Sequence, residues 1–192
     1  KHFTFSSERV GRWDRALRGW CGLLAGQLPS MRQRLSAAGG AMAAESAWSA
    51  LALSVGGKVF PREAWANLAA DEFARIAAAH SGDGPFLPVD VSAHPEAAWY
   101  HELAILHAAA SYAVQSGDRA LARCVTSSAD FAAREIQPDH ATFQPLGLFA
   151  FIWHAPARPL ADGLLHAARL HPPDAASLIL LADALYCLQL FL

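Results

Sequence analysis

Lysine is almost absent from this chain of 192 residues: it occurs only at Lys1 and Lys58, and arginine supplies the other basic side chains. Charged residues reach only 17%, whereas hydrophobic residues make up 54%. This balance excludes a disordered chain, because enough apolar surface is present to form a core. We expect one domain over residues 1–192, with helices buried on more than one side or a large face covered by another chain. The preference for arginine and alanine is typical of a GC-rich bacterial genome.

Cysteine is scarce as well. Cys21, Cys124 and Cys187 are far apart, lie among apolar neighbours and form no C-x-x-C pair. This spacing does not favour a disulfide framework. We expect small, reduced, buried thiols in a cytoplasmic protein.

Several catalytic motifs are missing. The chain has no phosphate loop of the Gly-x-x-x-x-Gly-Lys type, no Gly-x-Ser-x-Gly nucleophile turn and no D-D-x-x-D helix. These absences argue against nucleotide hydrolysis, serine hydrolysis and head-to-tail isoprenoid chemistry. We expect no bound cofactor.

A long uninterrupted hydrophobic run is also lacking. The most apolar stretch, residues 175–192, is broken by Asp183 and Gln189 and has no flanking basic residues. These features predict a buried helix rather than a membrane span.

Charge is unevenly spread along the chain. The net charge is −2, but residues 1–40 carry seven basic and two acidic side chains, a net charge of +5. Four of the basic residues, Arg9, Arg12, Arg15 and Arg18, step by three and spiral around a helix, so a solvated face explains them. Phosphate, an acidic protein or anionic lipid are alternative partners for them. Aromatic residues do not alternate with them as in nucleic-acid-binding segments, so we expect no nucleic-acid partner.

Apolar residues recur at steps of three and four along most of the chain, and the alternation of a strand is missing. The pattern predicts an all-α protein of antiparallel helical hairpins, with Pro29 ending the first helix, a bend at Gly39–Gly40 and an end at Gly56–Gly57. About eight helices are expected: one ending at Pro29, then 31–55, one starting at Pro61, 95–115, one capped by Asp118, 146–153, 160–170 and 174–191.

One concentration of polar residues lies at the start of the helix expected after Pro95. His101, Glu102 and His107 follow Trp99 there. On a helix, His101 and His107 point about 240° apart, so they cannot bind one metal ion together, and this is not an H-E-x-x-H site. We expect no metal. In a purely structural role, His101 and Glu102 bind backbone or neighbouring polar groups, and His107 is a satisfied core imidazole.

Two loops add further candidates. Residues 137–145 contain Asp139 followed by His140, and a carboxylate beside an imidazole can act as a general acid and base. The structural alternative is that Asp139 caps the following turn. The other loop, residues 81–94, is rich in glycine and proline and carries Asp90, and long loops in compact domains are often functional.

Asp183 stands apart because its neighbours in the sequence are apolar. Leu180, Leu181, Ala184 and Leu185 flank it. An unpaired buried carboxylate is costly, so we expect Asp183 to bind a backbone donor or a histidine from another helix.

The Ala- and Leu-rich helical pairs, with starts such as Trp99-Tyr-His-Glu-Leu, resemble α/α-toroid proteins, a group that includes sugar-processing enzymes and terpene cyclases. The segments 101–107 and 137–144 look similar to uncharacterised bacterial helical proteins of that kind, over residues 90–192. The resemblance implies a ligand where inner-helix ends meet in a funnel. No catalytic residue is carried over, because QW repeats and a D-x-D-D acid are missing. A closed toroid has about twelve helices, so about eight indicate a partial toroid or an open helical array.

Two functions follow from these patterns. In the first, the two loops meet at one end of the helices and form a pocket that binds or transforms a small polar or amphiphilic molecule. Its residues are four acid/base candidates and four ligand-binding candidates: His101, Glu102, Asp139 and His140, and Asp90, His94, Trp99 and Trp153. In the second, the chain is a non-enzymatic scaffold or homodimer, whose contact surfaces are the helix at 174–192 and the Arg-bearing first helix.

Overall fold

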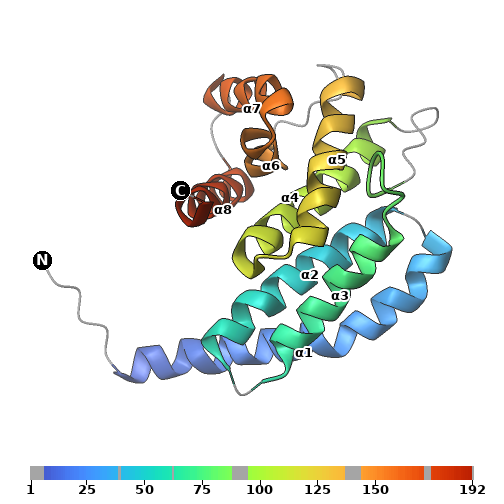
Figure 1. The fold of residues 1–192 in the computed structure, drawn as a ribbon. Helices are drawn as coiled ribbons and strands as arrows, with labels where there is room; N and C mark the ends of the chain where they lie inside the picture. Colours follow the sequence, from blue (N-terminus) through green and yellow to red (C-terminus); the bar gives the residue numbers. More distant parts are fainter. Residues whose placement is uncertain are drawn as a thin grey trace, which may run out of the picture.

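The computed structural model describes residues 7–38, 40–61, 63–87, 95–136, 144–170 and 174–191, without the side chains of 7–13, 32–38, 40–42 and 95. These residues form eight α-helices and one short 3-10 helix, with no strand among them, which confirms the all-α prediction (Figure 1). The helices are α1 (Ser7–Ala38), α2 (Gly40–Val59), α3 (Trp65–Ala79), α4 (Pro95–Ser116), α5 (Arg119–Glu135), α6 (Leu148–Trp153), η2 (Ala155–Ala157), α7 (Arg158–Leu170) and α8 (Ala175–Phe191).

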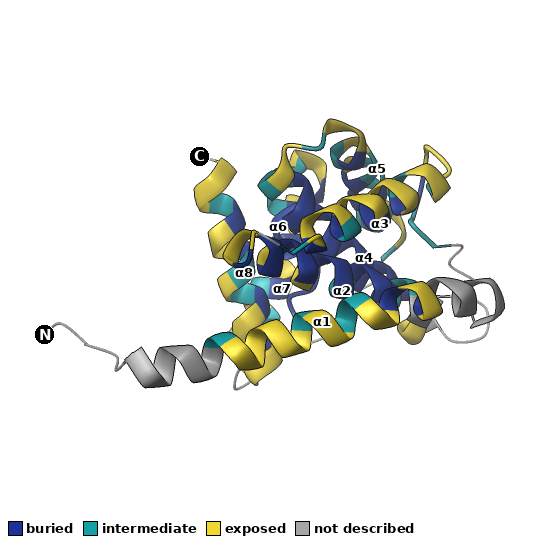
Figure 2. Ribbon diagram, turned by 90° about the horizontal axis from the view of Figure 1, so that it is seen from below, coloured by how far each residue is buried: buried dark blue, intermediate teal, exposed yellow. Residues whose placement is uncertain are grey.

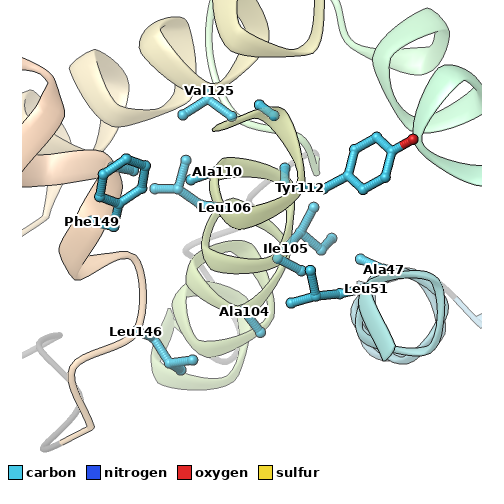
Figure 3. Packing of buried hydrophobic residues seen from close by; sticks show 14 of the residues in the cluster. Ala47, Leu51, Ala104, Ile105, Leu106, Ala110, Tyr112, Val125, Leu146 and Phe149 are labelled. Atoms are coloured by element: carbon cyan, nitrogen blue, oxygen red, sulfur yellow. The ribbon is translucent and has the colours of Figure 1, made fainter. Parts of the chain in front are cut away.

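Helix α4 is the centre of the molecule. Helices α1, α2 and α3 lie on one side of it, and α5, α6 and α8 pack against its other faces, with α7 beyond α6 (Figure 1). Every residue of α4 from Glu102 to Ala113 is buried. Ile105 points toward Leu51 of α2, whereas Leu106 points the other way, toward Phe149 (Figure 3). This helix confirms the expectation from the composition that some helices are buried on more than one side.

The prediction that Pro29 ends the first helix is wrong. Helix α1 continues through Pro29 to Ala38. A proline inside a helix loses one backbone hydrogen bond and costs about 3 kcal/mol. The residues around it offset this cost, because Leu28 and Met31 are both buried. Tertiary packing therefore overrides the local stop signal, and the break between the first two helices falls ten residues later.

The expected end of the second helix at Gly56–Gly57 is also wrong, because α2 runs on to Val59. The two glycines permit close packing instead. A Cβ atom at Gly56 would lie 2.7 Å from Sγ of Cys21 in α1, and one at Gly57 would lie 2.8 Å from the backbone nitrogen of Ala66 in α3. Both distances are too short for real Cβ contacts, so the absence of a side chain lets three helices meet here.

The start of α5 agrees with the sequence. Oδ1 of Asp118 accepts hydrogen bonds from the N–H groups of Ala120 (2.9 Å) and Leu121 (3.0 Å), as in a regular amino-terminal cap. This cap fixes the residue at which α5 begins.

Helix α8 differs from the buried helix expected at its position. It contacts α4 and α6 on one side, and its opposite side is exposed (Figure 2). None of the helices in the described ranges combines the length and the hydropathy that crossing a bilayer requires.

Replacing Gly57 with alanine tests the close approach of α2 and α3. In an ordinary helix this change stabilises by up to about 1 kcal/mol, but here the new methyl group would collide with the backbone of Ala66. We expect G57A to lower the free energy of unfolding by about 2 kcal/mol in a urea titration. The control is G22A in α1, where no atom lies within 4 Å of the new Cβ and a small gain is expected. Equal stability of the two variants would contradict this packing.

Candidate functional site

Glu102, the leading acid/base candidate, is completely buried. Its carboxylate accepts hydrogen bonds from the N–H groups of Phe86 and Leu87, both at 2.9 Å, and from the Ser128 hydroxyl at 2.6 Å. Burial raises the pKa of Glu102, although these three hydrogen bonds act in the opposite direction. The contacts tie the segment after α3 to α4 and α5, which confirms the structural role that the sequence left open.

The other predicted site residues are spread over several environments. Asp90, His94, Asp139 and His140 lie outside the described residues, so the pocket formed by the two loops stays a prediction. His101 is half-buried, with its ring 5.9 Å from that of Tyr100.

The two tryptophans of the predicted site differ in exposure. Trp99 is 1% exposed and stacks on Phe131 of α5, with ring centroids 5.8 Å apart. Its Nε1–H is buried and has no hydrogen-bond partner among the described residues. Trp153 is half-buried, packs against Phe149 and Phe191, and lines an open groove. Of the two, Trp153 is therefore the one that a solute can reach.

His107, which is buried, and Asp183, which is half-buried, form a polar pair between α4 and α8. Nε2 of His107 lies 3.1 Å from Oδ2 of Asp183, and the hydroxyl of Ser111 donates to the same oxygen. The N–H of Gly147 points at Nδ1 of His107, at 3.3 Å. Nδ1 is therefore the acceptor, and we assign the imidazole proton to Nε2. The predictions of a satisfied core imidazole and of a histidine partner for Asp183 are both confirmed.

The ionisation of Asp183 follows from these contacts. Burial raises the pKa of Asp183, but hydrogen bonds from His107, Ser111 and Cys187 outweigh burial and hold the pKa below its usual value. The carboxylate is therefore ionised at neutral pH and accepts several hydrogen bonds at once.

Cys187 completes this cluster as a buried thiol. Its Sγ is 3.4 Å from Oγ of Ser111, its side chain is fully buried, and burial raises the pKa of the thiol to about 11. Although cysteine, serine, histidine and aspartate lie together, the two nitrogens of His107 contact Asp183 and Gly147, so the imidazole is not hydrogen-bonded to Ser111 or Cys187. The cluster attaches α8 to α4.

The cavities outside this core include an apolar cleft and a more polar groove. An apolar cleft of about 290 Å³ between α4, α6 and α7 is lined only by nonpolar residues: Leu103, Ile136, Phe151, Pro159, Leu160, Gly163, Leu164 and Ala167. A more polar groove of about 550 Å³ follows the outer face of α5 and contains Arg119, Arg123, Asp130, Trp153 and His154. Apart from Trp153, the residues of this groove were not predicted, because its walls come from segments more than 20 residues apart in the sequence.

Within the described ranges, no group of three or more histidine, cysteine, aspartate or glutamate side chains could hold a metal ion. No family model, curated protein or solved structure matches this chain. The likeness to α/α-toroid proteins therefore stays a prediction.

Replacing Glu102 with alanine separates a structural role from a catalytic one. The change leaves one buried and two partly buried donors without their acceptor, and each unsatisfied buried group costs about 1–3 kcal/mol. We expect E102A to reduce the free energy of unfolding by about 3 kcal/mol. The exposed Glu96, in the first turn of the same helix, supplies the control E96A, which should be nearly neutral. Unchanged stability of E102A would show that the buried hydrogen bonds contribute little.

The low pKa of Asp183 makes part of the stability depend on pH. Its folded-state pKa lies below the unfolded value near 3.8. The carboxylate therefore stabilises the fold above that value, and this contribution is lost as the pH falls through the folded-state pKa. We expect D183N to be less stable than the parent by about 2 kcal/mol at pH 7, with a difference that shrinks below about pH 4.

Urea titrations across this pH range measure the effect, with D162N on the exposed face of α7 as the control. A constant difference between D183N and the parent at every pH would contradict the role given to the carboxylate.

Proposed function

We propose that this chain is a helical interaction module that forms a homodimer through the outer face of α8. The observation that carries the proposal is the exposure of five large apolar side chains on one face of a helix of 17 residues. Each is between 46% and 64% exposed. They are Leu178, Ile179, Leu185, Tyr186 and Leu190.

The outer face of α8 carries no charge. At 100° per residue, Leu185, Leu178, Ala182, Tyr186, Ile179 and Leu190 cover an arc of about 140°, and Gln189 is the only polar residue within it. A surface helix normally has charged and polar residues on its solvent side. An apolar stripe of this width on a soluble monomer marks an interaction site.

The size of this face suits a contact between proteins. Five large side chains, each about half exposed, present roughly 500 Å² of apolar surface, given about 200 Å² for a large side chain. A stable interface buries about 800 Å² per partner. Leu17, Trp20 and Leu23 of α1 are also more than half exposed. The amino-terminal half of α1 lies on the same side of the molecule as α8 (Figure 1).

A second copy of the chain is the partner that this chemistry favours. In a two-fold dimer, each residue of the contact patch faces the same patch on the second copy. Such an interface is stable only where like charges do not face each other. Residues 175–191 contain no lysine or arginine, so anionic lipid or nucleic acid has no electrostatic attraction to this face. The only carboxylate within them, Asp183, is bound by His107.

Sedimentation velocity at two widely separated concentrations tests the dimer. We expect the parent chain to sediment as a dimer, and L185E to weaken association roughly a hundredfold or more, because an unpaired charge inside an interface costs about 3 kcal/mol or more. Leu185 is 62% exposed, so the variant should keep its fold and its melting temperature.

The control is L170E, which makes the same change at a side chain 66% exposed at the end of α7, outside the proposed interface. It should leave the dimer intact. A parent chain that is monomeric at both concentrations would disprove the proposal.

A further inference from the structure

The groove on the outer face of α5 has walls from three separate segments. Arg119, Arg123 and Thr126 come from α5, Asp83 comes from the segment after α3, and the pair Trp153–His154 ends α6. The groove measures about 550 Å³, within the range of sites that hold small molecules.

Hydrogen bonds hold two of these walls against α5. The hydroxyl of Ser127 accepts from the N–H of Gly84 and donates to the carbonyl of Gly82, both at 3.0 Å. On the other side, His154 Nε2 lies 3.3 Å from Oδ1 of Asp130. The groove is therefore a formed feature of the fold and not a gap between independent loops.

The charged side chains of the groove differ in whether they have an ion-pair partner. Asp130 contacts both His154 and Arg134, each at 3.3 Å, so its carboxylate already has two partners. Arg119 and Arg123 form no ion pair with any residue that the structure describes. They lie four positions apart, on one face of α5. Asp83 is the single acidic residue of the groove without an ion-pair partner among the described residues. The groove thus has two free guanidinium groups against one free carboxylate.

The far end of the groove has a different character. Trp153 is supported from behind by Phe149 and Phe191, with ring centroids 5.8 and 5.7 Å away. Arg123 and Asp130, which lies beside His154, are separated by seven residues, about 10 Å along the helix axis. One end therefore suits an oxyanion and the other a flat ring, at a separation that one small molecule can span.

We propose that this groove binds a small organic phosphate that carries a planar ring. Arg119 and Arg123 bind the phosphate oxygens, because a guanidinium group forms paired hydrogen bonds with oxyanions. Trp153 contacts the ring, and the Thr126 hydroxyl adds a polar contact between the two ends. The site is separate from the outer face of α8, so it does not depend on the proposed dimer.

Isothermal titration with phenyl phosphate, the chosen probe, tests the site in the complete chain. We expect saturable binding, and a loss of affinity of about tenfold or more in R119Q/R123Q, because the variant loses the hydrogen bonds between charged groups that hold the phosphate. Both arginines are exposed, so the double variant should keep the parent's melting temperature.

Two comparisons make the result decisive. R169Q, which removes an exposed arginine from the last turn of α7, should bind phenyl phosphate like the parent. Inorganic phosphate should bind more weakly than phenyl phosphate, since it lacks the ring. No binding by the parent, or an equal loss in R169Q, would overturn the proposed site. Equal affinity for the two phosphates would overturn the role of Trp153.

Discussion

The enclosure of α4 is the constraint on which the rest of the structure depends. A helix with neighbours on all its faces has no water to satisfy its polar side chains, so each of them requires a partner from another element. Glu102 finds its partners after α3 and in α5, while His107 finds them in α8 and just before α6. The polar groups of α4 thereby fix the positions of its neighbours.

This arrangement explains the unusual character of α8. Its buried face contains the carboxylate–imidazole contact with α4, whereas its outer face is almost wholly apolar. An apolar helix without a polar anchor could rotate about its axis with little change in the burial of hydrophobic surface. The bond between Asp183 and His107 selects one rotation, and the large apolar side chains then face outward. Specificity of orientation is the best-attested role of buried polar groups.

The sequence predicts the helices well where the signal is an amphipathic stripe or a side-chain cap. Asp118 caps α5 as expected, and the apolar surroundings of Asp183 predict its need for a partner. The failures at Pro29 and Gly57 share one cause. Both residues are local breakers of helices, but contacts with other helices decided the outcome, and these contacts are not visible in a short window of sequence.

The contacts of the candidate site residues were harder to predict from the sequence than the helices. The spacing of Glu102 on its helix does not reveal that two backbone N–H groups, 15 and 16 residues earlier, occupy its carboxylate. In the same way, Arg123 and Trp153 are 30 residues apart and meet only because α6 and η2 fold back on α5. A residue such as Trp153 can be proposed as a ligand contact because it is a tryptophan. The neighbours that form a groove around it, however, come together only in the fold.

The burial of Cys187 has a consequence for its reactivity. A thiol that is fully buried and has a raised pKa reacts with alkylating agents only after it reaches solvent. Because Cys187 lies between α8 and α4, it becomes accessible when the terminal helix detaches. The rate of alkylation at this sulfur therefore reports how often α8 detaches from α4 in the native chain.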